Sequence, residues 1–119
     1  MDGIKLTIAA ILVVNPAFAG EADVTAVKIT KASNGTYGFA VSVLHKDEGW
    51  DHFANKWEVV APDGTVLATR VLAHPHVGQL PFTRSTSGVT IPSGVNEVTI
   101  RANDSVHGLG GKEMKVIIN

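Results

Sequence analysis

The amino-acid sequence predicts an all-β fold. After Ala19, apolar residues alternate with polar ones or form short β-branched groups, and no segment has the apolar spacing of an ordinary helix. Gly, Pro and Asn interrupt these segments about every eight to twelve residues, which is the spacing expected of short strands joined by turns. Both observations favour a fold made of antiparallel strands.

The N-terminal segment, residues 1–19, has the features of a secretory signal peptide. A short initial region ends at Lys5, an apolar run covers residues 6–14, and Ala17-Phe18-Ala19 supplies the small residues that signal peptidase requires. The apolar run is too short to span a hydrocarbon core about 30 Å thick. We therefore predict cleavage after Ala19, a single domain over residues 20–119, a periplasmic or secreted location and no membrane span after cleavage.

Seven strands are predicted in that domain. In chain order they cover residues 23–32, 36–45, 56–61, 65–73, 84–91, 95–104 and 112–118. Asn34-Gly35, Pro62-Asp63-Gly64 and Pro92-Ser93-Gly94 provide tight turns after the first, third and fifth strands, because they contain the residues that positive or preset φ angles favour. Seven short strands predict a two-sheet, immunoglobulin-like antiparallel sandwich, in which Trp57 takes the place of a buried Trp on the third strand. Jelly rolls and small barrels are alternatives.

Composition excludes several classes of function. The chain has 10 Lys and Arg against 11 Asp and Glu, and no basic block, so nucleic acid is not an expected partner. It has no cysteine, so neither a disulfide nor a thiolate ligand is available. No G-x-S-x-G segment supports a serine nucleophile. The protein is therefore not expected to be a hydrolase, and an enzymatic activity of any kind is less expected than binding.

All five histidines are predicted to lie at one end of the sandwich. Successive antiparallel strands reverse direction, so the connections alternate between the two ends. The tight turns share one end, and the longer second, fourth and sixth connections share the other. Those connections contain every histidine and, beside them, four acidic residues: Asp47, Glu48, Asp51 and Asp104. Long loops held by a rigid sandwich are where function is expected.

The segment His74-Pro75-His76 adds a metal-binding pattern. Proline holds the preceding residue extended, and residues two apart in an extended segment point the same way. Imidazoles with carboxylates and no thiolate suit Cu(II) or Zn(II), with iron as a further possibility, and copper has the highest affinity in the usual order. The predicted metal ligands come from the following set: His45, His52, His74, His76, His107 and Asp104.

Two resemblances accompany these patterns. The segment GWDHFANKWEVVAPDGTVLATRVLAHPHVGQLPFTR and the later HGLGG resemble a group of small exported bacterial β-sandwich proteins, a resemblance that implies no activity. His45, His52-Phe53, Trp57 and NDSVHGLG also partly resemble superoxide reductases of the desulfoferrodoxin type. Those proteins hold one iron with four histidines and a cysteine on an immunoglobulin-like domain. Here Asp104 stands where the cysteine would precede His107-Gly108, so the thiolate is missing.

The leading hypothesis is an exported protein that binds copper, or else zinc or iron, for buffering or delivery rather than for turnover. Its partners would be the metal ion and another exported protein. One alternative is a non-metal, immunoglobulin-like module whose loops bind a protein or small ligand, with the histidines serving hydrogen bonding or pH response. A further alternative is a mononuclear-iron oxidoreductase related to superoxide reductase.

Overall fold

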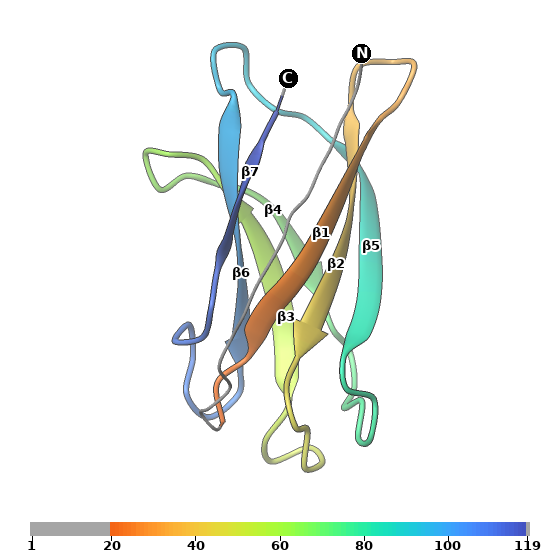
Figure 1. Cartoon of the computed structure of the whole chain (residues 1–119), viewed down its shortest axis with the longest axis vertical. Coiled ribbons are helices and arrows are strands. Elements are labelled where there is room, and N and C mark those ends of the chain that lie inside the picture. The colour runs from red at the N-terminus through yellow and green to blue at the C-terminus, as the bar shows by residue number, and fades with distance from the viewer. Residues whose placement is uncertain (1–19, 119) are drawn as a thin grey trace.

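The computed structural model describes residues 20–118 and contains two antiparallel sheets (Figure 1). The seven strands are β1 (Asp23–Lys31), β2 (Tyr37–Leu44), β3 (Ala54–Val60), β4 (Val66–Val71), β5 (Phe82–Val89), β6 (Glu97–Asp104) and β7 (Met114–Ile117). The three-stranded sheet has the order β1-β2-β5, and the four-stranded sheet has the order β4-β3-β6-β7. The all-β prediction is confirmed. The predicted signal peptide lies outside the described residues.

Each predicted strand is present, and the differences are at the strand ends. β3 begins at Ala54 instead of residue 56 because Ala54 pairs with Asp104 on β6. β5 begins at Phe82 instead of residue 84 because Phe82 pairs with Val43 on β2. In both cases the partner strand extends the ladder into a segment whose own sequence resembles a loop.

Alternation along the strands separates the core from the surface. On β6, Val98, Ile100 and Ala102 are buried between the sheets, and the residues between them are partly exposed. Trp57 on β3 is fully buried, as the sequence predicts. The inward face of β6 ends with Asp104, whose side chain is also buried, at 1% exposure. The alternation that buries Val98, Ile100 and Ala102 therefore also buries the carboxylate of Asp104 at the end of the strand.

The two ends of the sandwich differ as the strand parity predicts (Figure 1). The β1–β2, β3–β4 and β5–β6 turns lie at the upper end in the figure, and the longer β2–β3, β4–β5 and β6–β7 loops lie at the lower end. The chain at Gly20 also lies at the lower end, beside the β6–β7 loop. Over residues 20–118, no helix is long and apolar enough to cross a bilayer.

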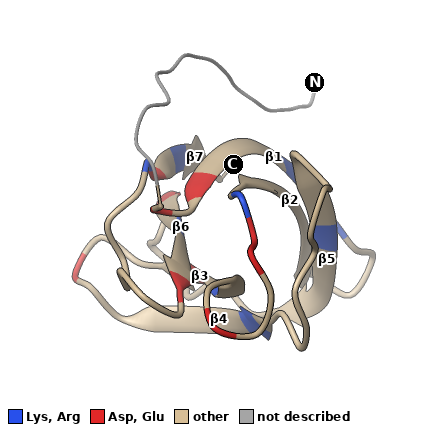
Figure 2. Ribbon diagram, turned by 90° about the horizontal axis from the view of Figure 1, so that it is seen from below, with Lys and Arg blue, Asp and Glu red and all other residues tan. Residues whose placement is uncertain are grey.

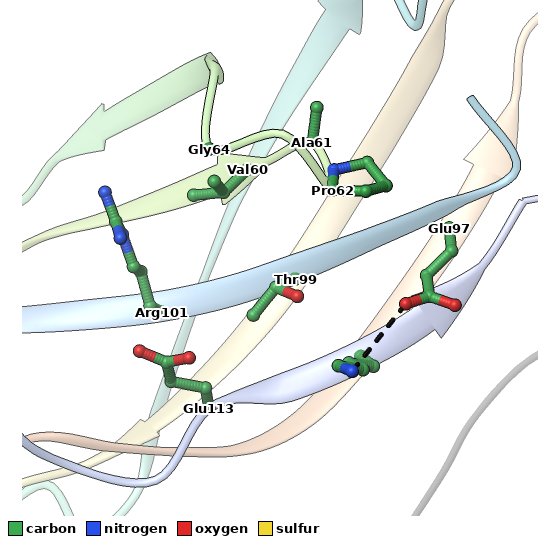
Figure 3. A pocket seen from close by; sticks show the side chains of 9 residues that line it. Val60, Ala61, Pro62, Gly64, Glu97, Thr99, Arg101 and Glu113 are labelled. Atoms are coloured by element: carbon green, nitrogen blue, oxygen red, sulfur yellow. Dashed lines mark ion pairs between the residues drawn. The ribbon is translucent and has the colours of Figure 1, made fainter. Parts of the chain in front are cut away.

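A charged pocket lies on the outer face of the four-stranded sheet (Figure 3). Two ion pairs lie in it or at its edge: Arg101 Nε lies 2.8 Å from Glu58 Oε1, and Lys115 Nζ lies 3.9 Å from Glu97 Oε2. Burial raises the pKa of Glu58, but the hydrogen bonds from Arg101 and Lys56 hold that pKa below its ordinary value. The pocket contains no histidine, so it offers no imidazole ligand.

Candidate metal centre

Three side chains from three different segments converge at the long-loop end. His45 directly follows β2, His52 stands two residues before β3, and Asp104 is the last residue of β6. Each offers one ligand atom, and these atoms lie within 4.8 Å of one another. His45 and Asp104 are buried, and the side chain of His52 is 15% exposed. Among residues 20–118 this is the group of histidines and carboxylates that could hold a metal ion.

A backbone oxygen completes the group. The carbonyl oxygen of Gly20 lies 2.9 Å from His45 Nε2 and 3.3 Å from His52 Nε2. Asp104 Oδ2 lies 2.8 Å from His52 Nε2 and 3.6 Å from His45 Nε2. Two imidazole nitrogens therefore face two oxygen atoms, one from the backbone and one from a carboxylate.

Two further carboxylates orient the imidazole rings from outside. Asp47 Oδ1 lies 2.5 Å from His45 Nδ1, and Glu48 Oε1 lies 2.8 Å from His52 Nδ1. A carboxylate accepts a hydrogen bond, so each Nδ1 carries a proton and donates it outward. In a neutral ring this leaves a lone pair on Nε2, the atom that faces the centre. This arrangement of carboxylate, histidine and inward Nε2 is the usual support of a metal-bound histidine.

When both rings are neutral and protonated on Nδ1, the centre has an excess of electron pairs. Both Nε2 atoms are then acceptors, like Gly20 O and Asp104 Oδ2, and the donors from elsewhere in residues 20–118 that reach these atoms come from His107 and the backbone near it. Either an added proton on each ring or a metal cation would offset this excess. Consistently, the hydrogen bond to Glu48 raises the pKa of His52 in spite of partial burial, and the Gly20 carbonyl and Asp104 act in the same direction.

The spacing of the four acceptors suits a transition metal. Ligands held about 2.0–2.1 Å from a tetrahedral ion lie about 3.3 Å from one another. Four of the six separations among these atoms are given above and range from 2.8 to 3.6 Å, and the ligand atoms of His45, His52 and Asp104 all lie within 4.8 Å of one another. These separations are compatible with one ion bound between the four atoms.

His107 contacts the centre from the β6–β7 loop. Its Nδ1 lies 3.1 Å from Asp104 Oδ2, and its ring centroid lies 5.0 Å from that of His52. Its side chain is 38% exposed, so it borders solvent on the open side. Burial raises the pKa of Asp104, but the side chain and backbone of His107 and the backbone of Val106 lower it below the ordinary value. Asp104 is therefore an anion that these donors stabilise.

His74 and His76 form a separate pair. Their ring centroids are 4.7 Å apart, and His76 stacks on Phe82 at 4.2 Å. His74 Nδ1 lies 3.1 Å from Pro75 O, and neither ring nitrogen of His76 has a hydrogen-bond partner. Burial, together with Arg84 and His74, lowers the pKa of His76 and keeps it neutral. Of the six predicted ligands, the structure groups His45, His52 and Asp104, places His107 beside Asp104, and leaves this pair outside the group.

Asp47 connects the two groups of histidines. Its Oδ1 bonds His45 and accepts the Ala54 N–H at 3.0 Å, and its Oδ2 accepts the His76 N–H at 2.7 Å. Acidic segments are visible in the loops around this end (Figure 2). The sequence places Asp47 and Glu48 near the histidines but does not separate their orienting role from that of Asp104. No sequence pattern indicates Gly20, because a backbone carbonyl leaves no residue-type signal.

The chain is similar to a protein of Halomicrobium mukohataei that is named "Putative lipoprotein". The two are 38% identical over 96 residues, which is 81% of this chain and 47% of the relative. The chain thus spans about half the length of the curated relative it matches. No protein-family model matches the chain, and no solved structure does.

Proposed function

We propose that this protein is an exported metal-binding protein, with copper as the preferred ion and zinc or iron as alternatives. The observation that carries the proposal is the convergence of His45, His52 and Asp104, whose ligand atoms lie within 4.8 Å of one another, with Asp104 Oδ2 at 3.6 Å from His45 Nε2 and 2.8 Å from His52 Nε2. The outward hydrogen bonds to Asp47 and Glu48 fix the rings in the tautomer that a metal needs. His107 supplies a further ligand from the open side.

The donor set favours copper over harder ions. Imidazole nitrogens suit copper, zinc, iron and nickel, and the usual affinity order places Cu(II) first. The centre lacks the thiolate through which superoxide reductases tune their iron, because Asp104 takes that position. Binding, buffering or delivery of the ion is therefore our proposal, in preference to turnover.

Export supports the same function. The relative from Halomicrobium mukohataei is named as a lipoprotein, which fits an envelope protein, and residues 1–19 here have the pattern of a signal peptide. Exported proteins can meet copper and zinc without competition from the cytosolic thiols. We also propose the immunoglobulin-like assignment, because strands one, two and five share one sheet and strands three, six and seven share the other, as in that fold; strand four departs from the constant-type pattern by joining the second sheet beside strand three.

The test is a copper titration of the untagged protein beginning at Gly20, followed by elemental analysis. We expect one equivalent of Cu(II) to bind tightly, and His52→Ala to weaken binding by at least about a hundredfold because one of few ligands is lost. His74→Ala is the matched control, since it removes a histidine of the same end that lies outside the group, and binding should change less than about threefold, which is about 0.7 kcal/mol or less. Less than one equivalent bound, or equal losses in both variants, would exclude the proposed centre.

A second candidate function is a protein-interaction module. Large apolar side chains are exposed in all three long loops: Trp50, Val77, Leu80, Val106 and Leu109. Exposed apolar residues at one end are typical of a surface that contacts a partner. This candidate predicts the same thermal midpoint with a chelator and with Cu(II). A metal present at about 100 times its dissociation constant would instead stabilise the folded state by about 2.7 kcal/mol.

A further inference from the structure

We propose that cleavage after Ala19 creates one of the metal ligands, so that the centre is completed only when the protein has been exported. The new ligand is the α-amino nitrogen of Gly20, acting together with the Gly20 carbonyl oxygen. The inference rests on the proposed metal-binding function and adds to it a dependence on processing.

The Gly20 carbonyl already lies inside the centre. Its oxygen is within 3.3 Å of Nε2 of both His45 and His52. In an N-terminal residue the amino nitrogen and the carbonyl oxygen are separated by two carbon atoms, so both can bind one ion in a five-membered chelate ring. Since the oxygen is in place, the free amine needs only rotation about bonds of the same residue to reach the ion.

The position of Gly20 is fixed by its surroundings. A Cβ at this residue would collide with the ring of His107, so Gly20 packs closely against that ring. Immediately after it, Ala22 and Val24 are buried at 1% and 4% exposure. The Val24 N–H bonds Lys112 O at 2.8 Å, and the Lys112 N–H bonds Asp23 Oδ1 at 2.7 Å. Gly20 therefore stands at the start of a segment that is held firmly against the β6–β7 loop.

The sequence places the cleavage at the same residue. Ala17-Phe18-Ala19 is the predicted signal-peptidase site, independently of any contact in the folded domain. Hydrolysis by that peptidase adds water across the Ala19–Gly20 bond, leaving a carboxylate on Ala19 and an ammonium group on Gly20. An α-amino group has a pKa of about 7.7–8.0, so a metal can displace its proton near neutral pH. Before cleavage this nitrogen is an amide and a poor ligand.

The experiment compares two chains that differ by one residue. The first begins at Gly20, as confirmed by mass spectrometry, and the second retains Ala19 with its amino group acetylated, so that it has no free α-amine. Each is titrated with Cu(II) against a competing chelator, and each is also prepared with ¹⁵N-glycine for electron paramagnetic resonance. We expect the Gly20 chain to bind Cu(II) at least about tenfold more tightly and to release more protons on binding. Its nitrogen hyperfine pattern should change with ¹⁵N-glycine, because the new amine is a glycine nitrogen, and the chain that retains Ala19 should show no such change.

The outcomes separate the two proposals. Equal affinities and no isotope effect, with binding still lost in His52→Ala, would overturn the role of the amine and leave the metal centre standing. Absence of Cu(II) binding by both chains would overturn the metal centre and the role of the amine together. Tighter binding with the isotope effect in the Gly20 chain, and without it in the chain that retains Ala19, would establish the processed N-terminus as a ligand.

Discussion

The two ends of the sandwich differ in how far apart in the sequence their hydrogen-bonded residues lie. At the tight-turn end, Asn34 Oδ1 accepts hydrogen bonds from the N–H and hydroxyl of Thr36, and Asp63 Oδ1 accepts one from the Thr65 N–H. These partners are two residues apart and exposed. At the long-loop end, the buried Asp47 bonds the backbone of Ala54 and His76, 7 and 29 residues further along the chain.

The hydrogen bonds of the tight-turn end therefore depend on neighbouring residues in the sequence, whereas those of the long-loop end depend on the tertiary structure. An exposed turn gains little from its side-chain hydrogen bonds, because water offers the same groups an alternative partner. A buried carboxylate that bonds distant segments fixes the loops relative to one another, and its loss leaves buried donors without a partner. The long-loop end is therefore built as a network, and the histidines occupy positions that this network sets.

The largest effect is expected from Asp47→Ala. The substitution leaves the N–H groups of Ala54 and His76 without acceptors in a buried site. At about 1–3 kcal/mol for each unsatisfied group, the free energy of unfolding of the metal-free protein should fall by about 3 kcal/mol. Urea unfolding in the presence of a chelator measures it. A loss under about 1 kcal/mol would mean that the network does not stabilise this end.

A smaller effect is expected from Gly111→Ala, which tests how closely the segment after Gly20 packs on the β6–β7 loop. An added Cβ would collide with the backbone carbonyl of Ala22, which cannot move without shifting the strand. We expect a loss of about 2 kcal/mol. Gly110→Ala is the control, because its Cβ would meet only the flexible side chain of Glu21, and its effect should stay below about 1 kcal/mol. Similar losses for both variants would contradict the close packing.

The smallest effect is expected from Asp63→Ala at the tight-turn end. The hydrogen bond from the Thr65 backbone holds the pKa of Asp63 below its ordinary value of 3.8. Because the folded-state pKa is depressed, the stabilisation is present above the ordinary pKa and is lost as the pH falls through the folded-state value. Thermal melts at pH 7 should show a small deficit in the variant that disappears in acid. A deficit at pH 7 as large as that of Asp47→Ala would remove the contrast between the two ends.

The sequence determined much of the fold because its signals are local. Alternating residues define strands such as β6, and Asn34-Gly35 or Pro62-Asp63-Gly64 define turns from a few neighbouring side chains. Strand parity then follows from topology and brings His45, His52 and His107 to one end. The approximate strand positions and the shared end of the histidines were therefore within reach of the sequence.

The tertiary structure alone decided which histidines share a centre. The segment His74-Pro75-His76 has a metal-binding pattern, yet His76 stacks on Phe82 and the pair lies outside the group formed by His45, His52 and Asp104. The fourth acceptor is the carbonyl of Gly20, an atom that every residue possesses and no sequence pattern marks. Local sequence preferences determine where the chain turns. The packing of loops that are distant in sequence determines which ligand atoms lie together, and that packing places the start of the domain beside the histidines.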